Sequence, residues 1–490
     1  MVKCRVEAEG SFKAYGQLGV MAKLGEGLTQ TGFLGNEQMT RTIQALKLCR
    51  ETASLESIKH VQLVGTSPVR EAANREEFLR RVHDETGLSM RVLSGNEEAL
   101  YGFLGAARSV GAQTALFFDL GGGSLELTYS EKYRVKGILS LPLGALKLTS
   151  MYAGKDGTFS RKARAKLAKH ISDLLPTRRE LGLDKDAVIV GTGGTVRAMA
   201  RFDQNQIEYP LNKVHNYQIE YDSVQQMSRE FFRLSLEELG NIDAIGETRS
   251  PTIAAGGLVV RLLMEELGFK RLTASTHGLR DGILIEFLDR GQSPRGLAQK
   301  EDVERLLVRE ALPQRLTGMG ELAECLARND ILDLRQKTII LAAMAKGRSR
   351  DSAEADPDAL FGILMSEDLP MSHEDQIFMA TSLVRARRAR SANWLVRKYG
   401  GMMSRDDVKS LKKMGTCLRL MEVLDRAGAQ IRVAYSGGLR ISVIDSRWPF
   451  PLELARSSAL NLSTSIKRPV SIFTSAKEKE RHTGLLRTAT

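Results

Sequence analysis

A glycine-rich turn between two strand-like segments constrains this 490-residue chain more than any other feature. Residues 117–126 read as an apolar strand that ends in Asp119, followed by three glycines, Ser124 and a second carboxylate. After the turn, Leu125 and Leu127 alternate with polar residues, which predicts a second strand. P-loops and dinucleotide fingerprints need a helix at this point. The sequence therefore favours a strand–turn–strand hairpin.

Such a hairpin suits phosphate binding. Glycines permit positive φ angles and close backbone approach, so amide N–H groups can point at a phosphate. Asp119 stands at the end of the strand, where Mg²⁺ can be shared with phosphate oxygens. An ordinary tight turn is the alternative interpretation of a single glycine run. Further glycine runs at Gly191 and Gly256, each read as a turn after a strand, favour two lobes that close on a nucleotide or phosphate chain.

The composition indicates a globular chain of roughly three domains. Hydrophobic residues make up 42% of it, no apolar run is long enough for a membrane span, and no secretory signal opens the chain. Four widely spaced cysteines are typical of a reduced cytoplasmic protein. The formal net charge of +12 favours a nucleic acid or a phosphate polymer as partner. The basic runs 161–166 and 385–390 contain no aromatic residues, which disfavours nucleic acid.

Strand and helix patterns alternate over the first 290 residues, which predicts an α/β fold, and mostly helical patterns follow. The expected organisation is an α/β lobe at 1–112, a second lobe at 113–290, a helical domain at 297–428, a small α/β appendage at 429–476 and a disordered end at 477–490.

Two candidate residues precede the hairpin. Glu97 and Glu98 lie in the first turn of a predicted helix, where carboxylates ordinarily stabilise the helix dipole. The alternative makes one of them a general base that activates a water. Arg70 follows a strand and a loop of small residues. A surface ion pair is its ordinary role, and a phosphate clamp is the alternative.

Six segments together resemble the exopolyphosphatase/guanosine pentaphosphate phosphohydrolase (Ppx/GppA) family of the actin-like ATPase superfamily. They are residues 23–28, 65–70, 92–99, 118–126, 191–195 and 278–282, in the family's order. The resemblance implies two actin-like (ribonuclease H-like) lobes. It also implies Mg²⁺-dependent removal of terminal phosphate from inorganic polyphosphate.

The resemblance also implies roles for individual residues. Glu98 matches the catalytic glutamate, and Asp119 and Glu126 match the metal-binding acids. The phosphate-binding set is Arg70, Gly121, Gly122, Gly123, Ser124, Gly193, Gly194 and Lys169. Hydrolysis of guanosine pentaphosphate is the alternative activity, and a non-catalytic polyphosphate-binding protein is a further alternative. We expect a cytoplasmic homodimer.

Two departures from the family pattern stand out. Family members begin with a strand and a first phosphate loop, Asp-x-Gly-Ser-Asn-Ser, whereas this sequence starts at Met1 within the next strand and contains no such loop. We favour a start codon that is placed too far downstream over a protein that lacks half of its phosphate-binding site. A missing first strand would leave sheet edges unpaired.

The second departure lies in the helical region, which resembles a metal-dependent phosphohydrolase-like (HD-like) domain. Residues 345–347 replace its His-Asp metal pair. We therefore expect a non-catalytic module that contacts polyphosphate through Arg385, Arg387, Arg388 and Arg390, or that dimerises.

Overall fold

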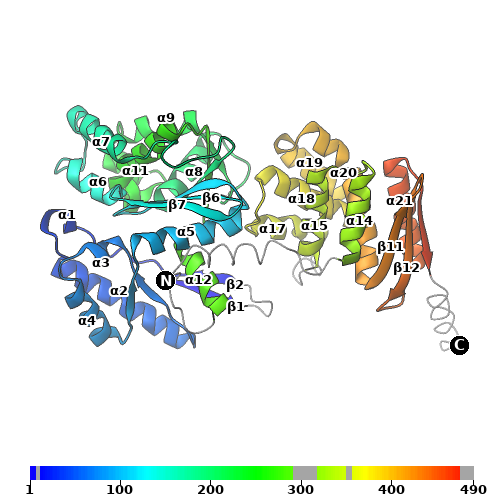
Figure 1. The fold of residues 1–490 in the computed structure, drawn as a ribbon, viewed down its shortest axis with the longest axis horizontal. Helices are drawn as coiled ribbons and strands as arrows, with labels where there is room; N and C mark the ends of the chain where they lie inside the picture. The colour runs from blue at the N-terminus through cyan, green and yellow to red at the C-terminus, as the bar shows by residue number, and fades with distance from the viewer. Residues whose placement is uncertain (7–11, 291–316, 349–355, 475–490) are drawn as a thin grey trace. The chain divides into compact units, whose positions relative to one another are not determined.

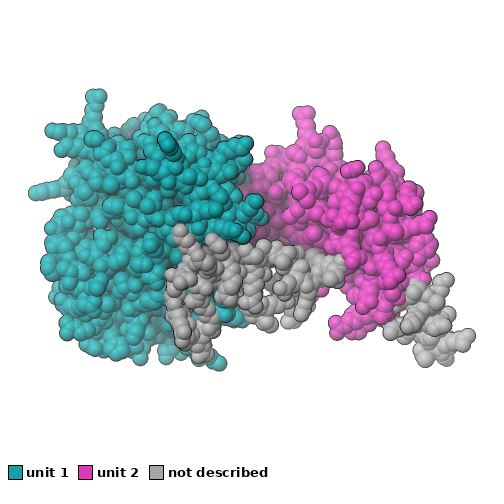
Figure 2. Space-filling view, viewed as in Figure 1, with its two compact units in different colours: residues 1–311 teal, residues 312–490 magenta. Residues whose placement is uncertain are grey.

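The computed structural model describes residues 1–6, 12–290, 317–348 and 356–474. The chain forms two compact units, 1–311 and 312–490, which are described separately (Figures 1 and 2). The division between them falls in a stretch outside the described residues, as does the end predicted to be disordered. The predicted boundary between two lobes at residue 112 stays a prediction.

A six-stranded mixed sheet dominates the first unit, in the order β7-β6-β5-β8-β10-β9. Its strands are β5 Ala115–Leu120, β6 Leu125–Glu131, β7 Arg134–Leu141, β8 Val188–Thr192, β9 Gln218–Glu220 and β10 Arg271–Ala274. The hairpin strands β5, β6 and β7 are antiparallel, whereas β5, β8 and β10 run parallel. The strand–turn–strand hairpin predicted from the sequence is therefore confirmed.

Helices cover both faces of this sheet. Leu116 and Phe118 of β5 belong to one core, and Ala115 and Phe117 to the core of the opposite face. Because successive strand residues point to opposite faces, burial on both sides explains the continuous apolar run of β5. The first core includes α6 Ala145–Tyr152, α7 Arg161–Leu174, α8 Gly194–Gln206, α9 Tyr221–Phe231, α10 Leu236–Gly240 and α11 Gly246–Leu267. The second includes α5 Gly95–Val110 and α12 Leu279–Arg290 (Figure 1).

The helices α5 and α12 approach each other at two glycines. A Cβ on Gly105 would lie 2.1 Å from the Gly278 carbonyl oxygen, and one on Gly282 would lie 2.1 Å from the Tyr101 carbonyl oxygen. The Tyr101 hydroxyl donates to the Glu286 carboxylate beside this crossing. Only glycine permits so close a backbone contact.

The part of unit 1 that precedes α5 has no comparable sheet, and we call it the small-sheet region. Its strands are β1 Val2–Val6, β2 Phe12–Gln17, β3 Leu63–Gly65 and β4 Met90–Val92. The pairs β1–β2 and β3–β4 share no strand, so each has unpaired edges within the described chain. The helices α1 Leu28–Thr31, α2 Asn36–Leu55, α3 Ser67–Glu71 and α4 Arg75–Thr86 accompany them. A separate core that includes Met39, Ile43 and Phe78 joins α2, α3 and α4 to β3 and β4. Phe12 of β2 packs instead against the core that contains α5 and α12.

The second unit is helical and then α/β, as the composition predicts. Its helices are α14 Thr317–Arg328, α15 Leu334–Gly347, α17 Pro357–Ser366, α18 His373–Arg387, α19 Ala389–Tyr399, η1 Gly400–Met402 and α20 Arg405–Arg426. A three-stranded sheet follows, with β11 Ala429–Tyr435, β12 Leu439–Ser446 and β13 Val470–Thr474, and with α21 Leu452–Ile466 before β13. The likeness to an HD-like domain stays a prediction.

Two expectations are wrong. Gly256 does not lie in a turn after a strand but in the interior of α11. A Cβ there would lie 2.8 Å from the Thr195 side chain, so the glycine serves close packing of α11 against α8. Arg387 is not available to a polyanion, because its buried guanidinium forms an ion pair of 2.8 Å with buried Glu422.

Two further observations concern the chain as a whole. All four cysteines are free thiols. Within the described ranges, no helix combines the length and the apolar character that crossing a membrane requires.

Candidate active site

The glycine hairpin between β5 and β6 forms the floor of the candidate site. Asp119 and Glu126 are paired across the two strands, and the Gly121 N–H donates to the Ser124 carbonyl at 3.0 Å. None of the three glycines has a positive φ, so that expected reason for glycine is wrong. Close approach is the actual reason at Gly123, where a Cβ would lie 2.3 Å from the Ser67 hydroxyl oxygen.

Backbone N–H groups at the start of α6 form hydrogen bonds with the carbonyl oxygens of this turn. The N–H groups of Ala145 and Lys147 donate to the carbonyls of Gly121 and Gly122, each at 3.0 Å. No described residue accepts a hydrogen bond from the N–H of Gly122 or Gly123. Consecutive free amides of this kind can form an anion-binding concavity.

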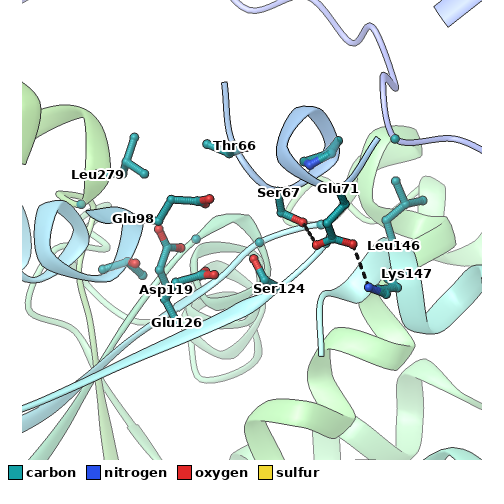
Figure 3. A pocket seen from close by; sticks show the side chains of 18 of the residues that line it. Thr66, Ser67, Glu71, Glu98, Asp119, Ser124, Glu126, Leu146, Lys147 and Leu279 are labelled. Carbon is teal, nitrogen blue, oxygen red and sulfur yellow. Dashed lines mark hydrogen bonds and ion pairs between the residues drawn. The ribbon is translucent and has the colours of Figure 1, made fainter. Parts of the chain in front are cut away.

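A cavity of about 590 Å³ lies over the hairpin (Figure 3). Glu98, Asp119 and Glu126 line it together, from α5, β5 and β6 respectively. Figure 3 shows their carboxylates on one side of the cavity and Ser67, Glu71 and Lys147 on the other. Ser67 and Glu71 belong to α3, and Lys147 belongs to α6.

The local structure of α5 separates the two neighbouring glutamates. Ser94 caps the helix by accepting from the Glu97 N–H at 3.2 Å, and the Glu97 carboxylate accepts from the Ser94 N–H at 2.8 Å. This reciprocal arrangement is a capping box. Glu97 is thereby committed to the helix terminus, whereas Glu98 is buried and lines the cavity.

Burial raises the pKa of all three carboxyl groups. It raises the pKa of Glu126 to about 8, with further upward contributions from the charges of Glu98 and Asp119. For Glu98, burial outweighs the opposing effect of the Arg70 guanidinium, so its pKa is raised. The pKa of Asp119 is raised by burial despite a hydrogen bond from Thr192 and the charges of two arginines.

These acids fit a Mg²⁺ ion by their chemistry. Mg²⁺ prefers oxygen ligands and is bound through one or two carboxylates together with substrate phosphates. Asp119 and Glu126 face each other across the hairpin, and each resists carrying an uncompensated charge. A divalent cation would compensate those charges. The residues present therefore fit the metal that the sequence predicts.

Cationic side chains line the same cavity, and the sequence analysis missed them. They are Lys147 of α6, Arg197 of α8 and Arg280 of α12. Burial and the charges of Arg249 and Arg280 lower the pKa of Arg197. Within the described ranges, Arg197, Arg249 and Arg280 form no ion pair with a carboxylate. The signal was available, because Arg197 and Arg280 each follow a glycine of a motif by a few residues.

Part of the predicted phosphate-binding set lines the cavity, namely Gly121, Gly122, Gly123, Ser124 and Gly193. Arg70 does not; its guanidinium donates to the Leu93 carbonyl at 2.8 Å and to the Glu98 carboxylate. Gly194 lies beneath Arg249, whose guanidinium would be 1.9 Å from a Cβ at that position. Lys169 lies on α7, where its side chain is 77% exposed and paired with Asp173 at 3.0 Å. The structure does not bring Lys169 to the cavity.

The fold and the site together define a class. A mixed sheet whose glycine hairpin and acidic residues form the floor of a polar cavity is the arrangement of the actin-like phosphotransfer proteins. The profile of the Ppx/GppA phosphatase family matches residues 5–291, and the chain belongs to that family. It is therefore a hydrolase, an enzyme that transfers a phosphoryl group to water.

Three known proteins illustrate the similarity. Exopolyphosphatase 2 of Mycobacterium tuberculosis is 26% identical over 276 residues, covering 54% of this chain and 86% of the relative. Exopolyphosphatase 1 of Mycobacterium leprae is 31% identical over 229 residues, covering 46% of this chain and 67% of the relative. The crystal structure of an exopolyphosphatase from Cytophaga hutchinsonii covers 59% of this chain and 93% of its own, at 20% identity and a TM-score of 0.55. This last similarity supports the fold.

Proposed function

We propose that this protein is an exopolyphosphatase that removes terminal phosphate from inorganic polyphosphate with Mg²⁺. The observation that carries the proposal is the meeting of three carboxylates with two free amides, those of Gly122 and Gly123, in one cavity. Glu98 and Glu126 are buried and Asp119 is half-buried. The relatives named exopolyphosphatase support the choice of substrate. A homodimer and a cytoplasmic location stay predictions.

Glu98 is the proposed general base. A base needs a carboxylate of raised pKa within reach of the attacking water, and burial raises the pKa of Glu98. Arg70 holds this carboxylate in place, because its guanidinium is fixed in turn by the Leu93 carbonyl at 2.8 Å. Arg70 thus acts as a positioning residue for Glu98 rather than as the predicted phosphate contact.

Asp119 and Glu126 are the proposed Mg²⁺ ligands. When bound, the ion would neutralise charge on the phosphate oxygens. The protein itself holds the two carboxylates opposite each other in the strand register, and Ser140 donates to Glu126 at 3.1 Å. That donor orients Glu126 before any cation arrives.

The phosphate chain would lie between the glycine amides and the arginines. Arg197 and Arg280 bring two positive charges to the cavity, and Arg249 adds a third beside Gly194. Burial lowers the pKa of Arg197, and the charges of Arg249 and Arg280 lower it further. A polyanion would relieve the repulsion between these charges, and guanidinium groups match phosphate oxygens in bidentate geometry.

The test replaces Glu98 and its neighbour in parallel. We expect Glu98→Gln to lower phosphate release by about 10²–10⁴-fold, because the general base is lost, while polyphosphate binding persists. Glu97→Gln is the matched control, since Glu97 caps α5 and does not line the cavity. Colorimetric phosphate release and filter binding measure the two properties.

Each outcome has a distinct meaning. Normal turnover by Glu98→Gln would refute the assignment of the base. Faster release from guanosine pentaphosphate than from long-chain polyphosphate would favour the alternative substrate. Binding without any release by the unaltered protein would favour a non-catalytic polyphosphate-binding protein.

A further inference from the structure

The sheet of the second unit has one open face. At alternate positions of β11 and β12, Ile431, Ile441 and Val443 are buried. That side packs against α14, α20 and α21. The intervening positions point the other way and are exposed, as at Arg432, Arg440 and Ser442. A sheet with one bare face is either solvated or a binding surface.

The strand register places these exposed side chains in two rows. Arg432 lies opposite Ser442, which lies opposite Phe473. In the next row Ala434 lies opposite Arg440, which lies opposite Ser471. Neither of these two rows contains an acidic residue, whereas Asp445 lies opposite Gln430 nearer the end of β12. We call the six residues of the two rows the open sheet face.

The chemistry of the open sheet face is basic and aromatic. The Phe473 side chain is 53% exposed, although a phenyl ring is normally buried. Arg432 and Arg440 form no ion pair within the described part of the chain. The face therefore offers two uncompensated guanidinium groups and one accessible ring, with Ser442 of the middle strand between Arg432 and Phe473.

A second aromatic side chain lies at the end of the same sheet. Trp448 follows β12, is 59% exposed, and carries the Arg447 guanidinium 5.7 Å from its ring centroid. The backbone N–H of Trp448 donates to the Ala427 carbonyl at 3.2 Å, which fixes the residue beside the start of β11. Two exposed rings thus occur around one sheet, and that of Trp448 has a guanidinium group next to it.

We propose that the open sheet face binds single-stranded nucleic acid. Bases would stack on Phe473 and Trp448, and phosphates would pair with Arg432 and Arg440, since binding of single strands combines stacking rings with basic side chains. An open sheet face with an exposed aromatic residue suits bases that are splayed out of a helix. Inorganic polyphosphate has no ring to stack, so it would leave both aromatic residues unused.

This proposal revises the expectation drawn from the linear sequence. The basic runs 161–166 and 385–390 contain no aromatic residue, which disfavoured nucleic acid. The open sheet face draws on three strands, with Arg432 and Phe473 separated by 40 positions in the chain. Only the fold brings these residues together.

The test measures binding of a fluorescent 12-nucleotide oligouridylate to the full chain by anisotropy. We expect Phe473→Ala to weaken binding about tenfold, because one stacking contact is lost, without changing the salt dependence. Arg432→Ala combined with Arg440→Ala should reduce the slope of log K against log salt by about 1.4, since each phosphate contact on a single strand contributes about 0.7.

Two matched controls lie on α19, away from the sheet. Trp394 is 53% exposed and Arg397 is exposed without an ion pair among the described residues. Alanine at either position should leave binding unchanged. Phosphate release by Phe473→Ala should also be unchanged, because Phe473 lies in the second unit and the cavity lies in the first.

Three results would overturn the proposal. The first is oligouridylate affinity in Phe473→Ala equal to that of the unaltered protein. The second is polyphosphate binding that depends on Arg432 and Arg440 and displaces the oligonucleotide whether or not Phe473 is present. The third is a self-association that Phe473→Ala abolishes, because a second copy would then cover the face.

Discussion

The two sides of the active-site cavity are built differently. Glu98, Asp119 and Glu126 rest on the six-stranded sheet and its helices, which are packed on both faces. Ser67 and Glu71 belong to the small-sheet region, whose strands are paired only two by two. Two-stranded pairs are marginal on their own. The three acids are thus held by the six-stranded sheet, which is packed on both faces. We expect the small-sheet region to have the lower free energy of local unfolding.

Two phenylalanine substitutions would test this difference most severely. Phe118 of β5 is 2% exposed and Phe78 of α4 is 0% exposed, so each change to alanine should cost about 3–5 kcal/mol. We expect Phe118→Ala to lower amide protection throughout unit 1. Phe78→Ala should lower it in the small-sheet region alone. Hydrogen exchange followed by mass spectrometry distinguishes the patterns, and equal loss in both variants would mean one cooperative unit.

The pH dependence of stability should come mainly from the large-sheet side. The pKa of Glu126 is raised from 4.5 to about 8 in the folded protein, so folding favours the protonated carboxyl. Its contribution is fully present below about pH 4.5 and is lost as pH rises toward 8, by roughly 1.4 kcal/mol per pH unit at most. Urea unfolding at several pH values measures the slope.

Glu126→Gln provides the control for this slope. The amide cannot ionise, so the free energy of unfolding should become much less dependent on pH between about 5 and 8. An unchanged slope in this variant would locate the effect in another group.

A change at the contact between the two sides should have a smaller effect. A methyl group at Gly123 would meet the Ser67 hydroxyl at 2.3 Å and the Ser67 Cβ at 3.1 Å. We expect Gly123→Ala to reduce phosphate release about tenfold, because α3 is pushed from the hairpin. Adding Ser67→Ala should restore part of the loss, and a strictly additive double variant would contradict direct contact.

The smallest effect is expected at the ion pair that joins α6 to the small-sheet region. Lys147 of α6 bonds Glu71 of α3 at 3.0 Å, and the two side chains are 23% and 38% exposed. Such partly exposed pairs contribute about 0–1 kcal/mol. Lys147→Ala should therefore barely change the unfolding midpoint while raising KM for polyphosphate. A large loss of stability would show that the two sides are joined more firmly than their sheets suggest.

The sequence predicted what depends on local pattern. Alternation after Ser124 sufficed for the hairpin, and the motif order sufficed for the family and the three acids that meet in the cavity. Spacing alone left Glu97 and Glu98 open, and the family resemblance singled out Glu98. The capping box supplies the physical reason, because it commits the Glu97 carboxylate to the helix terminus.

Predictions from the sequence failed where residues distant in the chain determine the environment of a residue. The glycines around Gly256 read as a turn because nothing local shows that α11 needs small residues against Thr195. Arg197 and Arg280 were missed although each follows a motif glycine, because only the fold shows that the two side chains meet in one cavity. The predicted phosphate-binding role of Lys169 rested on resemblance alone. Its exposed position on α7 lies outside the cavity.

The glycine crossing of α5 and α12 has a consequence for the working of the cleft. α5 carries Glu98 near its first residue, and α12 carries Arg280 near its own. At Gly105 and Gly282 a Cβ would lie 2.1 Å from the facing carbonyl oxygen, so the two glycines set how closely the helices approach. A side chain at either position would push the helices apart and change the distance between Glu98 and Arg280. The spacing between the group that activates water and the group that attracts phosphate therefore depends on two residues that have no side chain.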